Sequence, residues 1–499
     1  MTDPAISSLK HKQEMYLRFR DVSGENDPII PFQRPDKLPV SFIQEQVIGA
    51  EIEGLYDPSR MRVNCPTLSY VIKGFINIPA LDKALCEIVR RHEILRTNYT
   101  VDGKRIFQNI NDAPDTILQI SDIRALSQND RKNEAGRILT ELTTRPFSFF
   151  DNKLMITATL IIAGEDEHIL TVITNHIATD GLSMMILQKE LFILYQAYFY
   201  NTPSPLPELP IQYADFTMWE RKHYSGEFLE KKLDYWKRIP DTVNTSLPVD
   251  HKPASLSYDG DTVPVSILPE LVKRLMLLGR KNNFTLFTVL FSAFISLIHS
   301  FSGYKYNFFC MPVANRVRKE THSLIGCLMN FQFVHVRLEG NPTFMELVER
   351  VHETLLDVYD NYVPFHFITC VIPPQGPVVD FQLHTSMDLT VPADPTTGGR
   401  SSEQGISMPV QQDKPAQTAA GNLAVLPFKL PQSEFALFPI DVFLSGTSDT
   451  VSGHFKYQTA SYDRSTILKL VNDYIVLLTK LIRNPDLRIQ DMGITPHSV

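Results

Sequence analysis

One strand–loop–helix segment constrains the fold of this chain more than any other feature. Residues 168–174 (HILTVIT) are rich in β-branched side chains, which favour strands. The loop 175–181 (NHIATDG) follows, and residues 182–198 then have the length and apolar content of a helix. Asp180 is a good N-cap for that helix, because its carboxylate can accept the backbone N–H of Ser183. The segment therefore predicts polar residues at a point where a strand ends and a helix begins.

His176 is the residue of this loop that can carry chemistry. An imidazole changes charge near neutral pH, so it can accept a proton from an attacking amine or hydroxyl. The pattern H-x-x-x-D-G is too short to identify a function by itself. The rest of the chain therefore has to decide what the pattern means.

Length, charge and cysteine content limit the classes of function. A chain of 499 residues exceeds one ordinary core, so two lobes are expected. The 48 basic and 56 acidic residues give a net charge of −8, which argues against non-specific nucleic-acid binding. Five cysteines without a C-x-x-C pair indicate buried free thiols in a reducing compartment. The histidines outside the loop lie singly, so no metal site is expected.

The sequence also predicts no membrane partner. Its first ten residues, MTDPAISSLK, lack the apolar region of a signal peptide. The longest apolar stretch, residues 286–298, is too short to span a bilayer. A cytoplasmic protein is therefore expected.

Composition suggests how the chain is divided. Residues 1–38 are polar and read as an N-terminal extension. Four prolines in 202–212 indicate a connection between lobes, which places the first lobe at 39–206 and the second at 207–494. Residues 391–424 are rich in Pro, Gly, Ser, Thr, Gln and Ala, and they are predicted to form a mobile loop.

Periodicity predicts the main elements around the loop. Helices are expected at 80–91, 227–238, 269–281, 286–300 and 465–482. Strands are expected at 105–110, 154–162, 262–268, 435–444 and 454–459. Phe287, Phe291 and Phe294 are spaced by four and three residues, which is typical of core packing on a helix.

Seven segments in a fixed order carry a family resemblance. They are SFIQEQ (41–46), RHEILRT (91–97), NHIATDG (175–181), QYADFTMW (212–219), PVANR (312–316), IGCLMN (325–330), and the closing helix with Asn484-Pro485. Together they resemble the condensation domains of nonribosomal peptide synthetases over about residues 39–494. Each motif is modest, but seven in order are a strong signal.

The resemblance implies two chloramphenicol-acetyltransferase-like α/β lobes that form a V-shaped pseudo-dimer, with the active site in the tunnel between them. It implies transfer of an acyl group from the phosphopantetheine thioester of an acyl- or peptidyl-carrier protein to a small-molecule or carrier-bound amine or hydroxyl. No bound cofactor is then needed. No carrier-protein motif (G-G-x-S) and no adenylation loop occur here, so a free-standing enzyme of secondary metabolism is expected. A monomer is expected, because the two lobes supply the interface that related trimers build between their protomers.

Three residues of the loop are the catalytic candidates under this resemblance. His176 would take a proton from the nucleophile or orient it. Gly181 would let the substrate approach the helix start, where a backbone N–H can stabilise an oxyanion. Asn175 stands where the family has its first histidine, and it can form hydrogen bonds but cannot titrate.

Other motif residues are expected to support this loop. By resemblance, Asp180 points away from the substrate and pairs with Arg316, and a bidentate pair would fix the loop geometry. Ser183 and Asn330 could line the tunnel, or they could be helix-cap and strand-loop polar residues. The cluster 91–93 is interpreted as structural, because it ends a helix where its charges can cap carbonyls and pair with each other.

Three alternatives stay open. A non-catalytic module that recruits carrier-bound intermediates or partner enzymes is favoured by Asn175 and by residues 360–365, which keep only Pro-Phe of the family's H-Q-x-x-P-F. An acyl-CoA-dependent transferase of the same fold is possible, although its D-F-G-W-G segment is absent. A dihydrolipoyl acyltransferase core fits less well, because its D-G motif lies near the C-terminus.

Overall fold

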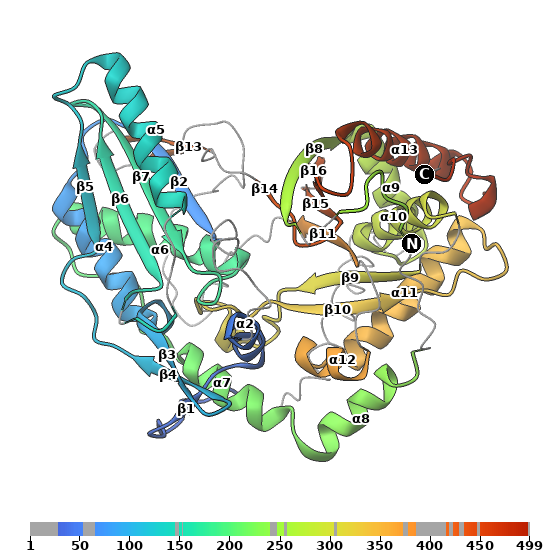
Figure 1. Ribbon diagram of the computed structural model, residues 1–499, viewed down its shortest axis with the longest axis horizontal. Coiled ribbons are helices and arrows are strands. Elements are labelled where there is room, and N and C mark those ends of the chain that lie inside the picture. Colours follow the sequence, from blue (N-terminus) through green and yellow to red (C-terminus); the bar gives the residue numbers. More distant parts are fainter. Residues whose placement is uncertain are drawn as a thin grey trace, which may run out of the picture.

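Two lobes, each built on a β-sheet with helices packed against it, lie side by side in the computed structural model of the chain (Figure 1). The structure describes residues 28–52, 65–144, 149–151, 153–239, 247–253, 257–303, 307–372, 378–385, 416–418, 423–428, 434–446 and 450–497. One hydrophobic core runs through both lobes.

The first lobe is built on a six-stranded sheet with the strand order β12-β13-β2-β7-β6-β5. Its strands are β2 (Thr67–Lys73), β5 (Leu118–Asp122), β6 (Ile156–Ile162), β7 (Glu167–Thr174), β12 (Ala416–Thr418) and β13 (Leu423–Pro427). Its helices are α4 (Ile78–Arg91), α5 (Gln128–Thr144) and α6 (Gly181–Phe199). Helix α4 packs on α6. It begins where the Asn77 Oδ1 accepts the Ala80 N–H at 3.1 Å, with Pro79 in its first turn, and it buries Leu81, Leu85 and Ile88.

A small sheet lies at the base of this lobe, and helix α2 (Phe42–Ile52) lies between the two lobes, where it contacts α12 (Phe365–Val371) (Figure 1). The sheet has the order β1-β4-β3, with β1 (Leu38–Pro39), β3 (Thr97–Asp102) and β4 (Arg105–Ile110). Helix α2 begins with a capping box: the Gln44 N–H donates to the Ser41 Oγ at 3.3 Å, and the Ser41 N–H donates to the Gln44 Oε1 at 3.1 Å. The opening S-x-x-Q motif is therefore the start signal of this helix.

The second lobe is built on a seven-stranded sheet with the order β10-β9-β11-β15-β16-β8-β14. Its strands are β8 (Asp259–Ile267), β9 (Phe308–Val313), β10 (Asn330–His335), β11 (Val379–Thr385), β14 (Glu434–Phe435), β15 (Ile440–Gly446) and β16 (Val451–Gln458). The helices that follow 202–212 are α7 (Tyr213–His223), α8 (Gly226–Trp236), α9 (Pro269–Lys281), α10 (Leu286–Phe301), α11 (Phe344–Asp360), α12 (Phe365–Val371) and α13 (Arg464–Arg483). Strand β11 is parallel to β9 and β15, and the other pairs in this sheet are antiparallel.

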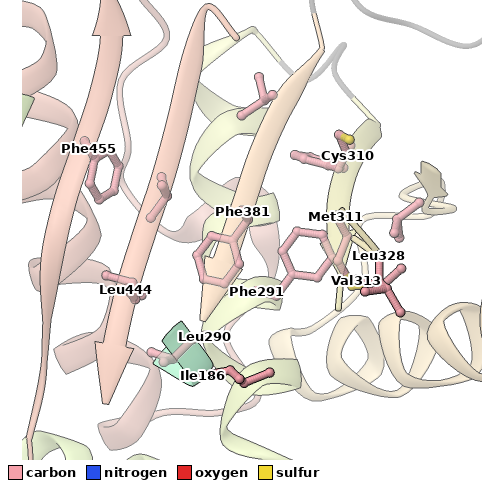
Figure 2. Packing of buried hydrophobic residues seen from close by; sticks show 14 of the residues in the cluster. Ile186, Leu290, Phe291, Cys310, Met311, Val313, Leu328, Phe381, Leu444 and Phe455 are labelled. Atoms are coloured by element: carbon pink, nitrogen blue, oxygen red, sulfur yellow. The ribbon is translucent and has the colours of Figure 1, made fainter. Parts of the chain in front are cut away.

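Helix α10 forms the centre of the second lobe's core. The rings of Phe291 and Phe294 lie 5.2 and 5.0 Å from the ring of Phe381 on β11, centroid to centroid. Figure 2 shows Phe291 beside Phe381, with Leu444 and Phe455 farther along the sheet. The predicted core role of these phenylalanines is confirmed.

Most predicted elements are present within a few residues, but two predictions are corrected in part, and the mobility of the loop 391–424 stays a prediction. The predicted loop 391–424 contains β12 and the start of β13, which pairs antiparallel with β2 of the first lobe. This pairing is between distant segments, and local composition does not encode it. Residues 391–415 and 419–422 of that loop lie outside the described residues. The predicted strand 435–444 is interrupted before β15, where Pro439 has no N–H for a ladder.

The sequence also led to expectations about membrane spans, metal sites and cysteines. In the part of the chain that the structure describes, no helix alone has the length and apolar character to cross a membrane; α9 and α10 reach it only together, across a 106° bend. The same part holds no group of three or more His, Cys, Asp or Glu side chains placed to bind a metal. All five cysteines are free, as predicted, but only Cys310 and Cys327 are buried. Cys65 and Cys86 are half-buried and Cys370 is exposed, which corrects the prediction that all are buried. The lobe boundary at 206/207 stays a prediction.

Candidate active site

The loop between β7 and α6 is shaped by Asn175. Its backbone N–H donates to the Met155 carbonyl at 2.9 Å, and its Oδ1 accepts the Ile177 N–H at 2.9 Å. The Ala178 N–H donates to the Asn175 carbonyl at 3.0 Å and closes a turn around His176. Asn175 therefore stabilises the turn, and its side-chain oxygen already has a backbone partner.

His176 occupies the middle of this turn and is half-buried. Among the residues that the structure describes, its imidazole has no hydrogen-bond partner. Its neighbours Ile177 and Ala178 are buried, and the Gln44 Nε2 donates to the Ile177 carbonyl at 3.4 Å. The backbone on either side of His176 is thus held by the protein, while the ring itself is left available.

Gly181 is the first residue of α6 and is exposed. A Cβ built at this position would meet no heavy atom within 4 Å. The predicted position at a helix start is confirmed, and the space beside it is open. A ligand group could therefore approach the first backbone amides of α6, which carry the positive end of the helix dipole.

Asp180 is the N-cap of α6 and is almost fully buried. Its Oδ1 accepts the Ser183 N–H at 2.8 Å, as predicted, and lies 2.9 Å from the Arg316 Nη2. The predicted Asp180–Arg316 pair is confirmed, but it is not bidentate. The Arg316 Nη1 donates instead to the carbonyls of Thr321 and Leu324, at 2.7 and 2.6 Å, because the guanidinium also holds the chain after β9.

Ser183 and Asn330 do not have the free side chains of tunnel-lining residues. Ser183 is fully buried, and its Oγ accepts N–H groups of Gly326 and Arg316 at 3.1 and 2.8 Å. Asn330 is buried, donates to the Tyr362 hydroxyl at 2.6 Å and accepts the Phe365 N–H at 3.0 Å. The helix-cap and strand-loop alternative is the one that these contacts support.

A five-residue segment of the second lobe, 325–329, is gripped from the first lobe and α7; we call it the clamp segment. The N–H groups of Leu328 and Met329 donate to the Asp180 Oδ2 at 3.1 and 3.2 Å. The Tyr213 hydroxyl donates to the Cys327 carbonyl at 2.8 Å. A Cβ at Gly326 would lie 2.1 Å from the Tyr213 ring, so only glycine permits this approach.

One residue of the cluster 91–93, His92, contacts Ile325, the first residue of the clamp segment. The Arg91 Nε and Nη2 donate to the two carboxylate oxygens of Glu190 on α6, at 3.1 and 3.2 Å. The His92 Nε2 lies 3.1 Å from the same carboxylate, and its Nδ1 accepts the Ile325 N–H at 3.3 Å. The predicted structural role is confirmed for Arg91 and His92, but their partner is Glu190. Glu93 pairs instead with Arg34.

Glu190 was not predicted from the sequence, although its signal was there. It is a buried acid in a helix that is otherwise largely apolar, and such a charge needs a partner. Burial alone would raise the pKa of the Glu190 carboxyl, but the hydrogen bonds from His92 and Arg91 outweigh it and lower that pKa. The charged Glu190 carboxylate therefore holds the side chains of Arg91 and His92 in place beside the clamp segment.

The two-lobed α/β fold places His176 on a loop between the end of β7 and the start of α6. The family model of the condensation domain matches residues 36–498. This chain therefore belongs to the condensation domain family, of the type found in nonribosomal peptide synthetases.

Two curated relatives illustrate the sequence likeness. A linear gramicidin synthase of Brevibacillus parabrevis is 31% identical over 465 residues, which cover 92% of this chain and 9% of the relative. Phosphinothricin tripeptide synthetase PhsC of Streptomyces viridochromogenes is 28% identical over 496 residues, covering 96% of this chain and 43% of the relative. The chain thus spans less than half the length of these relatives.

Solved structures agree on the fold. The X-domain from teicoplanin biosynthesis, determined in complex with OxyB, has a TM-score of 0.76 at 20% identity and covers 94% of this chain and 98% of its own. SgcC5 of Streptomyces globisporus has a TM-score of 0.67 at 21% identity and covers 90% of this chain and all of its own. The predicted fold class, two chloramphenicol-acetyltransferase-like lobes, is confirmed.

Proposed function

We propose that this chain transfers an acyl group from a phosphopantetheine thioester on a carrier protein to an amine or hydroxyl, forming an amide or ester. The observation that carries the proposal is the state of His176. The His176 ring has no hydrogen-bond partner among the described residues, whereas the side chains of Asn175 and Asp180 on the same loop accept backbone N–H groups. A proton acceptor must be free to meet its substrate, whereas Asp180 is committed to five protein contacts.

In the proposed reaction the nucleophile's nitrogen or oxygen adds to the thioester carbonyl while His176 accepts its proton. The C–S bond then breaks, and the proton passes to the departing phosphopantetheine thiolate, so no oxidant or cofactor is consumed. The negative carbonyl oxygen would lie beside Gly181, where backbone N–H groups at the start of α6 can donate to it. The tunnel between the lobes, a cytoplasmic location and a monomeric state belong to the same proposal.

A second candidate is a module that binds carrier-bound intermediates or a partner enzyme without turnover. Asn175 supports it, because the Oδ1 is used by the turn and the residue cannot titrate. The likeness to the teicoplanin X-domain, solved with OxyB, supports it as well. The two candidates differ in whether acyl groups are consumed.

The test is intact-protein mass spectrometry of an acyl-loaded carrier protein incubated with a panel of amines and alcohols. We expect the wild-type chain to unload the carrier and yield a condensed product, and His176→Ala to slow this by roughly 10²–10⁴-fold. His251→Ala is the matched control, because His251 is exposed and pairs only with Asp463 in the described residues. Carrier binding without acyl loss in the wild type would replace the enzyme with the recruitment module.

A further inference from the structure

We propose that His92 is a positioning residue, whose ring holds the clamp segment of the second lobe against the loop that carries His176. Its effect on chemistry rests on the proposed acyl transfer. The contact itself does not, and it can be tested without turnover.

The contacts of His92 fix its protonation. The ring is fully buried, and its Nδ1 accepts the Ile325 N–H at 3.3 Å. A backbone amide can only donate, so Nδ1 carries no hydrogen and the proton is on Nε2. Nε2 lies 3.1 Å from the Glu190 carboxylate, which accepts that proton's hydrogen bond. The neutral Nε2–H tautomer is thus the form that both neighbours require.

Glu190 makes this orientation rigid. Both of its oxygens accept from Arg91, whose guanidinium also donates to the Pro207 carbonyl at 2.9 Å. Arg91 and Glu190 come from α4 and α6, the two helices that pack together in the first lobe. The imidazole is therefore held by two helices of the first lobe and reaches across to the second.

The clamp segment passes this restraint toward the catalytic loop. Ile325 is its first residue, and Leu328 and Met329 at its other end donate to Asp180. Asp180 lies four residues after His176 and caps α6. Releasing Ile325 would loosen one end of a segment whose other end fixes the N-cap. The expected consequence is a misplaced reacting group, since an error of about 1 Å can cost about 10²-fold in rate.

Two substitutions separate the two hydrogen bonds of His92. In His92→Asn, the side-chain oxygen lies near the position of Nδ1 and can still accept the Ile325 N–H. In His92→Gln, the terminal nitrogen lies near the position of Nε2 and can still donate to Glu190, but Ile325 loses its acceptor. Both variants are uncharged and remove the ring, and Asn is smaller than Gln by one methylene group, so the melting temperatures of both are recorded. His251→Gln serves as a surface control.

The first readout is hydrogen exchange, followed by mass spectrometry, over peptides that cover the clamp segment. We expect His92→Gln to exchange about tenfold faster there than the wild type, with His92→Asn within about threefold of it, because only Gln leaves a buried amide unpaired. Equal exchange in His92→Gln and the wild type would overturn the proposed contact.

The second readout is the kinetics of acyl transfer from a loaded carrier protein. We expect His92→Gln to lower kcat by roughly 10–100-fold with little change in KM for the carrier, and His92→Asn to restore most of it. Equal losses in both variants, at melting temperatures that also fall equally, would reduce His92 to a packing residue. A wild-type chain without turnover would overturn the proposed function, and the exchange result would still decide whether His92 holds the clamp segment.

Discussion

At the scale of single residues, the loop 175–181 holds two kinds of polar side chain. Some form hydrogen bonds within the protein, and one, the His176 ring, forms none with the described residues. Asn175 and Asp180 satisfy backbone amides, and Asp180 also faces Arg316. His176 keeps its ring for something outside the described protein. Residue type alone would allow either Asp180 or His176 to act as a base, and the protein contacts of Asp180 are the reason why we propose His176.

Gly181→Ala tests whether the open space at the start of α6 is used. The new methyl group would meet no protein atom within 4 Å, so the fold should tolerate it. Alanine is a better helix former than glycine by up to about 1 kcal/mol, so the melting temperature should stay or rise slightly. If the acyl group occupies this space, kcat/KM for acyl transfer should fall by about tenfold or more. Wild-type kinetics in a normally folded variant would place the substrate elsewhere.

At the scale of elements, the family motifs mostly supply hydrogen bonds that connect helices, strands and loops. The S-x-x-Q motif starts α2, and its glutamine reaches the Ile177 carbonyl beside His176. Gln212 holds both sides of His92, accepting the Glu93 N–H and donating to the Arg91 carbonyl at 3.1 and 2.8 Å. These two motifs, which were identified by family resemblance, therefore serve mainly to hold elements of the fold together.

Asp180→Ala should be costly for this reason. It removes one member of a buried charge pair and leaves Arg316 and the two amides of the clamp segment without their acceptor. We expect a loss of about 3–5 kcal/mol, measured by urea unfolding. Asp463→Ala is the matched control, because Asp463 is also a helix N-cap but its side chain is 59% exposed. A loss below about 1 kcal/mol in Asp180→Ala would contradict the fastening role.

Local signals explain which parts of the site could be predicted. The helix start at Asp180 follows from capping chemistry, and the Asp180–Arg316 pair followed from resemblance. The grip of His92 and Glu190 on the clamp segment could not be predicted, because it joins residues 98 and 233 positions apart. Single-sequence patterns report on neighbours along the chain, whereas these contacts depend on how α4, α6 and the second lobe meet.

At the scale of the whole molecule, the two lobes are joined by backbone as well as by side chains. Strand β13 comes after most of the second lobe in the chain, yet it pairs with β2 in the sheet of the first. Residues of both lobes also share one hydrophobic core. The composition of 391–424 hid this strand, because small and polar residues predominate around it. The lobes should therefore behave as one unit.

Stability of this unit should depend on pH through Glu220 on α7. Burial raises the pKa of the Glu220 carboxyl from 4.5 to about 7, although its Oε2 accepts the Phe42 N–H. The folded state thus binds this proton more tightly than the unfolded state. Its stabilising effect is complete below pH 4.5 and is lost as the pH rises to about 7, by about 3 kcal/mol in total.

Glu220→Gln should abolish this dependence. Relative to the wild type, its melting temperature should rise progressively between pH 5 and pH 7.5, because the glutamine never has to ionise. The exposed Glu227→Gln on the neighbouring helix is the control and should follow the wild type at every pH. A constant difference between Glu220→Gln and the wild type across this range would show that the carboxyl does not titrate there.

The central claim is that His176 takes part in the reaction, whereas the other polar residues of the loop hold the structure. The most direct test of this claim is a single-turnover measurement on His176→Ala. Rapid quenching would follow acyl transfer from a loaded carrier protein, and thermal unfolding would be recorded on the same preparation. We predict a rate lower by about 10²–10⁴-fold at an unchanged melting temperature, since the ring bonds to no described residue. A near-wild-type rate, or a rate loss that is matched by unfolding, would contradict the role of His176 as the proton acceptor.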